Sequence, residues 1–255
     1  PPCTKLIDPN KFKRIVIASR DPNPIIDNGL QKLVDKGLKV EFNICEKEAK
    51  FINRRFFTFH EKKRPFVILK YAATMDGFIS EKNGHSKWIT SQKSRFSVHE
   101  LRSTCDAILV GRRTVQLDNP SLTSHGVGDD PKIVILDPSN KINEEYKAIN
   151  KNTIHLTDEL IEDKPVDNIQ NILKKLHSLN IQSVIVEGGA TTLTSFIDSG
   201  LFDEMHTYYA PKLIGDGISI YNTKKKISDS LNLHILKKEI FDNDIKITYY
   251  NKRAK

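Results

Sequence analysis

The chain has 255 residues, of which 38% are hydrophobic and 28% are charged, enough for one large globular domain or two smaller ones. Its longest apolar runs, such as residues 66–69 and 107–110, are far shorter than the roughly 20 residues that cross a bilayer. The composition therefore excludes a spanning helix and predicts no membrane partner. The first residues lack the pattern of a secretory signal, so we expect a cytoplasmic protein.

The net charge of +8 raises the question of nucleic-acid binding. The lysines, however, are spread along the chain and alternate with acidic residues, as in residues 46–50 and 224–230. We interpret them as a solvated surface whose field favours anionic phosphorylated ligands. The three cysteines are scattered and too few to frame a disulfide scaffold.

The first part of the chain alternates between strand and helix patterns. A short apolar run at 13–18 precedes a helix-patterned segment at 27–37, an alternating run at 38–44 and a second helical segment at 46–57. Two strands joined by one helix usually lie parallel, so this β-α-β-α order predicts the edge of an α/β sheet.

A basic link at residues 61–65 marks a boundary, because Pro65 disfavours helix before it. We therefore predict domains at 1–61 and 62–255. In the second domain, alternating strands and helices end in strands without helices, which indicates a mixed sheet with an antiparallel edge. The expected strands are 66–74, 106–111, 132–137, 183–187, 205–215, 233–241 and 245–250, and the expected helices are 91–103, 169–179 and 192–199.

The most informative local signal is residues 183–200, where an apolar strand ends in Glu187, passes through Gly188 and Gly189, and enters a helix. A glycine turn before a helix presents free N–H groups that suit a phosphate. The alternative is a tight turn with Thr191 as an ordinary helix cap. Glu187 follows the strand on the side where α/β sheets bind ligands.

Two further segments carry polar residues next to strands. Residues 109–123 combine a strand, a glycine, basic and hydroxyl residues and an Asp-Asn-Pro turn. Such a segment could bind a phosphate and ribose hydroxyls, but Asp-Asn-Pro is also a common turn sequence. Residues 69–90 place Lys70 inside an apolar strand, where a lysine is rarely buried without a partner. Its partner is expected to be Asp76, Glu187 or a ligand phosphate.

Five motifs in one order, within residues 70–80, 84–90, 98–115, 118–123 and 186–196, resemble the reductase domain of the bifunctional riboflavin-biosynthesis deaminase/reductase. The fold of that domain is similar to dihydrofolate reductase. The resemblance implies an α/β domain with a mixed sheet flanked by helices, an NADPH cofactor, a small phosphorylated pyrimidine substrate and a homodimer or higher homo-oligomer.

Upstream, residues 1–7, 14–24 and 52–57 resemble the end of that family's cytidine-deaminase-like domain. The family binds zinc there through an HAE motif and two cysteines. Only the second cysteine, Cys3, is present in this sequence. We therefore expect zinc and deamination only in the intact deaminase domain, and no tightly bound zinc in this chain.

The resemblance assigns roles residue by residue. Positions matching cofactor contacts are Ala72, Trp88, Thr90, Thr114, Asp118, Gly189, Ala190, Thr191, Thr192, Leu193, Thr194 and Ser195. Positions matching substrate contacts are Ser86, Arg102, Leu122, His125 and Glu187. His125 stands where the family often has a phosphate-binding arginine, so it is expected to be a weaker, pH-dependent substitute.

The implied reaction reduces 5-amino-6-(5-phosphoribosylamino)uracil to its ribitylamino form. Lys70 and Glu187 are the expected catalytic residues, assisting ring opening and proton movement, while Arg102 is expected to grip the phosphate. One rival is a reductase of a pterin, which needs no phosphate clamp. Another is a nucleic-acid-binding module, which the positive net charge favours but which no recognised sequence motif supports.

Overall fold

The computed structural model describes most of the chain, namely residues 3–23, 29–157, 165–221 and 226–254. The chain forms two compact units, Pro1–Lys63 and Arg64–Lys255. Across the part of the chain that is described, no helix has the length and apolar character needed to cross a membrane.

After a short helix that was not expected, the first unit has the predicted β-α-β-α order, with its second helical segment divided in two. Its elements are α1 (Cys3–Leu6), β1 (Arg14–Ile17), α2 (Gly29–Asp35), β2 (Lys39–Phe42), α3 (Glu46–Ile52) and α4 (Arg54–Lys62). Strands β1 and β2 pair in parallel, as expected for strands joined by one helix. The helix expected at 27–37 begins with two residues that lie outside the described part of the chain.

The helical segment expected at 46–57 is divided at Asn53, which ends α3 and precedes α4. The side-chain amide nitrogen of Asn53, Nδ2, donates to the carbonyl of Ala49 at 3.1 Å. The backbone N–H of Asn53 donates to the same carbonyl at 3.1 Å, so the helical ladder is intact up to Asn53, whose φ of −98° and ψ of 25° turn the chain away from the helical path.

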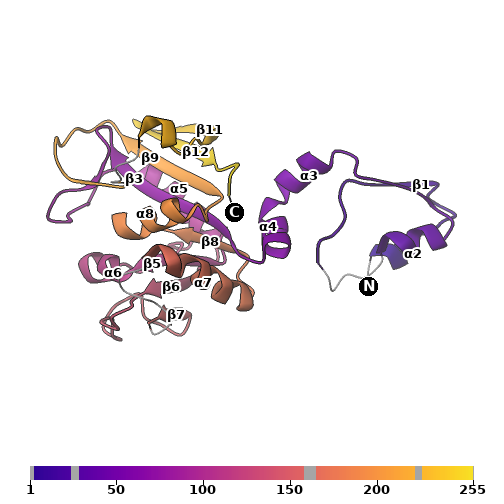
Figure 1. Ribbon diagram of the computed structural model, residues 1–255, viewed down its shortest axis with the longest axis horizontal. Coiled ribbons are helices and arrows are strands. Elements are labelled where there is room, and N and C mark those ends of the chain that lie inside the picture. Colours follow the sequence, from indigo (N-terminus) through magenta and orange to yellow (C-terminus); the bar gives the residue numbers. More distant parts are fainter. Residues whose placement is uncertain (1–2, 24–28, 158–164, 222–225, 255) are drawn as a thin grey trace. The chain divides into compact units, whose positions relative to one another are not determined.

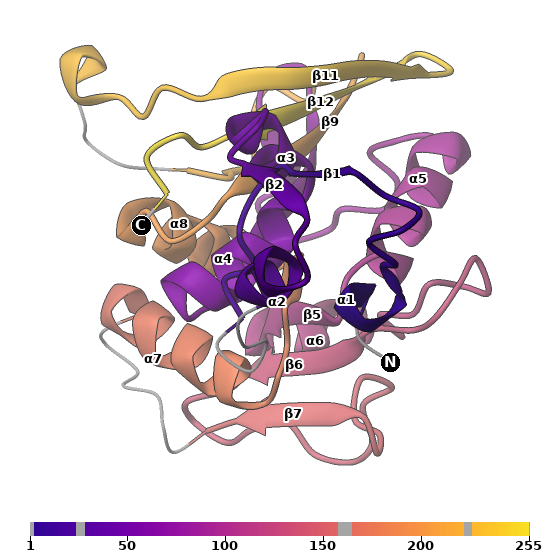
Figure 2. The same ribbon diagram turned by 90° about the vertical axis from the view of Figure 1, so that its right-hand side faces the viewer.

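The second unit contains an eight-stranded sheet in the order β11-β12-β9-β3-β8-β5-β6-β7. Figure 2 shows β11 and β7 at its opposite edges. The strands are β3 (Phe66–Thr74), β5 (Ala107–Gly111), β6 (Lys132–Leu136), β7 (Thr153–Leu156), β8 (Ser183–Val186), β9 (Glu204–Ala210), β11 (His234–Phe241) and β12 (Asp244–Tyr250). A small sheet pairs β4 (Phe78–Ser80) with β10 (Ile218–Ser219).

The pairing confirms the predicted mixed sheet with an antiparallel edge. From β9 through β3, β8, β5 and β6 to β7 neighbouring strands are parallel, whereas β12 is antiparallel to both β9 and β11. Strand β7 was not expected from the sequence, because its four residues alternate polar and apolar over too short a stretch to stand out as a strand.

Helices cover both faces of this sheet (Figure 1). They are α5 (Gln92–Ser103), α6 (Arg112–Asp118), α7 (Pro165–Ser178) and α8 (Ala190–Ser199), with a short 3-10 turn, η1, at Ile227–Asp229. Ser91 caps α5, since its side chain accepts from the backbone N–H of Ser94 at 3.2 Å. Helix α8 ends at Gly200 in the left-handed conformation, which glycine adopts without steric cost.

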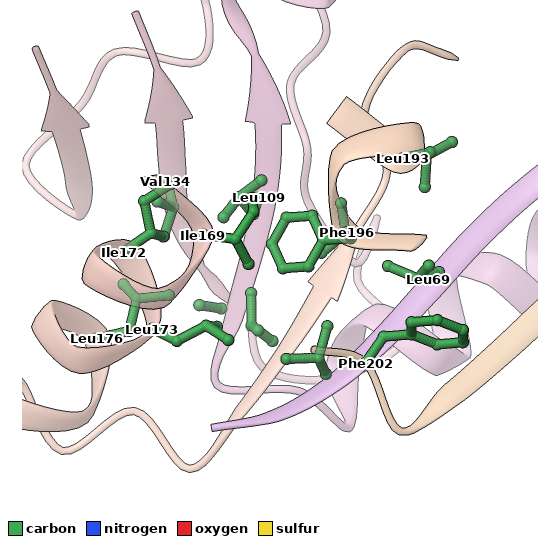
Figure 3. Packing of buried hydrophobic residues seen from close by; sticks show 14 of the residues in the cluster. Leu69, Leu109, Val134, Ile169, Ile172, Leu173, Leu176, Leu193, Phe196 and Phe202 are labelled. Carbon is green, nitrogen blue, oxygen red and sulfur yellow. The ribbon is translucent and has the colours of Figure 1, made fainter. Parts of the chain in front are cut away.

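Two hydrophobic clusters follow from the alternation of side chains along the strands. One face carries Leu69, Leu109 and Val134, which pack against α7 and α8 (Figure 3). The other face, which includes Ile68 and Ile108, packs against Leu101 of α5 and Val115 of α6. The central strands of the sheet are therefore buried on both sides, and polar residues are left to gather at the ends of these strands.

Candidate active site

Strand register places Lys70 beside Glu187. Leu69 of β3 pairs with Val186 of β8 in parallel. The residues that follow them, Lys70 and Glu187, therefore also lie side by side. The residues two positions earlier, Ile68 and Ile185, belong to the core on the α5 face, and alternation directs Lys70 and Glu187 to that same face. The Lys70 ammonium donates to Glu187 Oε2 at 3.3 Å.

Arg102 in the last turn of α5 completes this cluster. Its Nε and Nη2 donate to the two carboxylate oxygens of Glu187 at 2.7 and 3.0 Å, and its Nη1 donates to the carbonyl of Thr123 at 3.0 Å. This is the bidentate fork that gives an arginine–carboxylate pair its fixed geometry. Lys70, Glu187 and Arg102, distant in sequence, thus form one hydrogen-bonded group, called here the Glu187 cluster.

The Glu187 cluster answers the question of the lysine's partner. Asp76 is occupied elsewhere: it accepts from the Thr74 hydroxyl at 2.5 Å and from the backbone N–H groups of Ile214 and Gly215 at 3.0 and 2.8 Å. Asp76 therefore anchors a turn, and Lys70 pairs with Glu187.

Electrostatics keep Glu187 ionised. Burial by itself raises the pKa of this carboxyl, but the charges of Arg102 and Lys70 and their hydrogen bonds outweigh burial and lower the pKa to about 2. At neutral pH Glu187 is a fixed anion with no proton to donate. Because it stays ionised, Glu187 is expected to orient Lys70 and a ligand and not to exchange a proton.

Two helix N-termini meet beside the Glu187 cluster. Helix α8 starts after Gly189 and α6 starts after Gly111, and neither N-cap supplies a side chain to the first N–H groups. The Gly189 N–H donates to the Thr114 hydroxyl of α6 at 3.1 Å, so the two turns lie against each other. Uncapped helix starts of this kind attract anions.

Thr192 explains the two glycines at this junction. A Cβ atom on Gly111 would lie 2.6 Å from the Thr192 hydroxyl, and one on Gly188 would lie 2.6 Å from Thr192 Cβ. Only glycine at these two positions permits such a close approach of Thr192. The Thr192 side chain therefore packs between the two turns. Gly189 has more room, since its nearest such contact is Thr114 at 3.6 Å.

The rest of the predicted cofactor segment points away from the turn. Leu193 is fully buried in the core, and the Ser195 hydroxyl donates to the carbonyl of Thr191 inside α8. The Thr194 hydroxyl donates to the carbonyl of Ile220. Of the segment 189–195, the side chains free to meet a ligand are therefore those of Ala190, the exposed Thr191 and the partly exposed Thr192.

The aromatic ring of Trp88, in the loop after β4, lies against the basic side chain of Arg95 in α5. Trp88 is 62% exposed, and the Arg95 guanidinium lies 4.2 Å from its ring centroid. Arg95 also donates to the carbonyl of Thr90 at 2.8 Å, while Lys212 donates to the carbonyl of Trp88 at 2.7 Å. The guanidinium covers one face of the indole, and the exposed remainder of the ring is open to a ligand.

The remaining predicted positions lie in loops or strands around these features. Ser86 is partly exposed in the Trp88 loop, and Ala72 is partly exposed in β3. Asp118 ends α6 and is half-buried. Leu122 is buried in the core with a φ of 56°, so its side chain supports the loop and only its backbone is available to a ligand.

His99 is a residue of this region that sequence reasoning missed. Its ring stacks on the ring of the predicted His125, with centroids 4.2 Å apart and planes inclined by 23°. The available signal was its position three residues before Arg102, which puts both side chains on one side of α5.

Cys3 lies exposed in α1 as a free thiol. Among the residues that the structure describes, no group of three or more histidine, cysteine, aspartate or glutamate side chains is arranged to hold a metal ion.

Comparison with known proteins gives one consistent answer. A family model, the RibD C-terminal domain, matches residues 65–247. The riboflavin biosynthesis protein RibD of Aquifex aeolicus is 41% identical over 239 residues, covering 86% of this chain and 67% of that protein. For RibD of Synechocystis the identity is 33%, with coverage of 84% and 64%. The chain thus spans about two thirds of the length of these curated relatives.

Solved structures agree over nearly the whole chain. The diaminohydroxyphosphoribosylaminopyrimidine deaminase/5-amino-6-(5-phosphoribosylamino)uracil reductase of Thermotoga maritima superposes with a TM-score of 0.85 at 36% identity, covering 98% of this chain and 75% of that one. Acinetobacter baumannii RibD gives 0.86 at 29% identity, covering 98% and 76%. The fold, the matched residues and the sequence identity together show that this chain belongs to the RibD C-terminal domain family.

Proposed function

We propose that this chain reduces 5-amino-6-(5-phosphoribosylamino)uracil to its ribitylamino form with NADPH. The observation that carries the proposal is the Glu187 cluster, which lies at the ends of parallel strands beside two uncapped helix N-termini. Such an edge is where α/β sheets bind nucleotides and substrates. The Thermotoga maritima relative is named as a reductase of this same compound.

The residues of the site fit a phosphorylated dinucleotide. The N–H groups at the start of α8 are left uncapped by Gly189, and Arg112 and Arg113 open α6 beside them. These groups would hold the phosphates of NADPH, and the exposed ring of Trp88 offers a surface for a planar base. When bound, NADPH supplies the hydride.

The chain's own residues then have separate tasks. Reduction breaks the bond between C1 of the sugar and the ring oxygen, forms a C1–H bond, and places one proton on that oxygen. Lys70 Nζ is proposed to donate this proton, held in place by Glu187 at 3.3 Å. Arg102 fixes Glu187 through its fork and offers its remaining N–H groups to the substrate.

Other assignments extend from the family resemblance. We propose that the intact protein also deaminates the preceding pyrimidine, with zinc bound through Cys3 and residues that this chain lacks. A cytoplasmic homo-oligomer without nucleic-acid or membrane partners is likewise proposed.

The proposal is tested by mixing the protein, NADPH and the phosphoribosylaminouracil and following loss of the reduced nicotinamide absorbance. The expected result is oxidation that depends on both compounds and yields the ribitylamino product. Equal rates with the dephosphorylated substrate, or reduction of a dihydropterin instead, would favour the pterin-reductase alternative.

NADPH is expected to be used with a kcat/KM at least about tenfold above that for NADH, because Arg112 and Arg113 can pair with the 2′-phosphate. Arg113 is exposed, whereas Arg112 approaches the buried carboxylate of Asp137 at 4.0 Å. We therefore expect Arg113→Ala to reduce the preference and the matched exposed change Lys237→Ala to leave it alone. Equal kcat/KM for both cofactors in the unaltered chain would refute this assignment.

A further inference from the structure

Tyr208 lies beside Lys70 on the α5 face of the sheet. Tyr208 of β9 pairs with Ala72 of β3, and alternation puts Lys70, two residues before Ala72, on the same face. Because Ala72 has only a methyl group, it does not separate the ring from the lysine. The Lys70 ammonium lies 5.9 Å from the centroid of the Tyr208 ring. The ammonium therefore has two neighbours, the Glu187 carboxylate and an aromatic ring.

The Tyr208 ring is held in place from α5. Tyr208 is fully buried, yet it belongs to neither hydrophobic cluster of the described residues. A buried phenol hydroxyl needs a partner, and the Ser97 hydroxyl of α5 lies 3.2 Å from it. Burial raises the pKa of Tyr208 well above its ordinary value, so the ring stays neutral. Since α5 also carries Arg102, the ring is tied to the helix that fixes Glu187.

A second lysine lies against the same ring. The Lys246 ammonium is buried and lies 5.4 Å from the Tyr208 ring centroid. It pairs with Glu239 at 3.5 Å, as Lys70 pairs with Glu187 at 3.3 Å. The electron-rich ring attracts both cations, and each has a carboxylate of its own. The ring therefore helps to keep two like charges in separate ion pairs.

We propose that Tyr208 is a positioning residue for Lys70: its ring holds the ammonium at Glu187, in the orientation from which the proton reaches the sugar oxygen. The inference rests on the proposed function for the reaction. It goes further in giving a role to a buried side chain outside the Glu187 cluster. The ring is the part that acts on Lys70, because the hydroxyl is engaged with Ser97.

Two variants separate the ring from the rest of the side chain. Tyr208→Phe and Tyr208→Met both lack the hydroxyl, but only phenylalanine keeps an aromatic ring. We expect Tyr208→Met to lower kcat about tenfold with little change in KM, and Tyr208→Phe to recover most of that loss. Thermal midpoints are measured by circular dichroism, and all rates are taken below the lowest of them. Equal kcat values for the two variants would overturn the proposal.

A fluorinated series tests the ring without changing its packing. Phenylalanine carrying one, two or three fluorine atoms is incorporated at position 208. Each fluorine withdraws electron density from the face of the ring and weakens its attraction for a cation. We expect kcat to decline stepwise along the series. Because the size of the ring is nearly constant, a purely structural role would leave kcat independent of fluorination, and that result would contradict the proposal.

Tyr71→Met is the matched control. Tyr71 adjoins Lys70 in β3 but packs on the opposite face, where its hydroxyl lies 3.1 Å from that of Tyr209. Its kcat should equal that of the unaltered chain. In a Lys70→Met background, Tyr208→Met should lower kcat less than about twofold, because no ammonium is left to position. The same tenfold loss in both backgrounds would show that Tyr208 acts independently of Lys70 and would overturn the proposal.

Competitive acetylation tests the position of Lys70 without hydride transfer. Acetic anhydride labelling is followed by mass spectrometry of peptides, with the exposed Lys237 as internal standard. Lys70 should react several-fold faster in Tyr208→Met than in the unaltered chain or in Tyr208→Phe. An unchanged labelling rate in Tyr208→Met would refute the positioning role. The expected labelling in a chain that does not reduce the phosphoribosylaminouracil would refute the proposed function and leave the positioning of Lys70 by Tyr208 standing.

Discussion

Replacing Lys70 by methionine is expected to lower kcat by about a hundredfold or more, the contribution typical of a positioned proton donor, with little change in KM. Methionine keeps the length of the side chain but has no proton to give. Arg102 continues to satisfy both oxygens of Glu187, so the carboxylate is not left unpaired. Steady-state kinetics with varied substrate at saturating NADPH separate the two parameters.

The control for Lys70→Met is Lys237→Met, which alters an exposed lysine on β11 and should leave kcat unchanged. The thermal midpoint of Lys70→Met should stay close to that of the unaltered chain. A fully active Lys70→Met enzyme would remove Lys70 from the proposed mechanism, whatever its KM.

Asp203→Ala is expected to destabilise the second unit by about 3–5 kcal/mol, because it leaves the buried Arg64 guanidinium without its carboxylate. Arg64 donates to both oxygens of Asp203 at 2.7 and 2.9 Å, and both residues are buried. Asp203 also accepts from the backbone N–H of Val67 at 2.8 Å. Denaturant unfolding followed by fluorescence or circular dichroism measures the loss, which corresponds to about 10 °C in midpoint temperature.

The double variant Arg64→Met with Asp203→Leu should recover part of this loss, since apolar replacements can substitute for a buried ion pair. The exposed pair of Lys237 with Glu239 is the comparison, and Lys237→Ala should cost less than about 1 kcal/mol. A loss this small for Asp203→Ala would show that the buried pair does not hold the start of β3 in place.

The strands and their mixed sheet could be predicted because apolar runs and turn residues are local signals. Strand order depends on pairing between distant segments and could not be read from them. The ion pair of Arg64 and Asp203 shows the difference: the sequence marks Arg64 only as part of a basic link, while its partner lies 139 positions away. The short helix α6 was likewise not predicted, because its seven residues bury only Val115.

The site divides in the same way. Lys70 and Glu187 could be singled out from sequence, since a lysine inside an apolar strand and a glutamate at a strand end need an explanation. The orientation of side chains within 189–195 could not, because helical phase decides which of them turn into the core. His99 was overlooked because its significance comes from stacking on His125, a contact between a helix and a loop.

The central claim is that hydride passes from NADPH to C1 of the sugar, and isotope transfer tests it most directly. The protein is given NADPH deuterated at the transferable position of the nicotinamide, together with the phosphoribosylaminouracil, and the product is analysed by mass spectrometry and NMR. Our account predicts one deuterium per product molecule, located on C1 of the ribityl chain. Deuterium on the pyrimidine ring, or oxidation of NADPH with an unlabelled product, would contradict it.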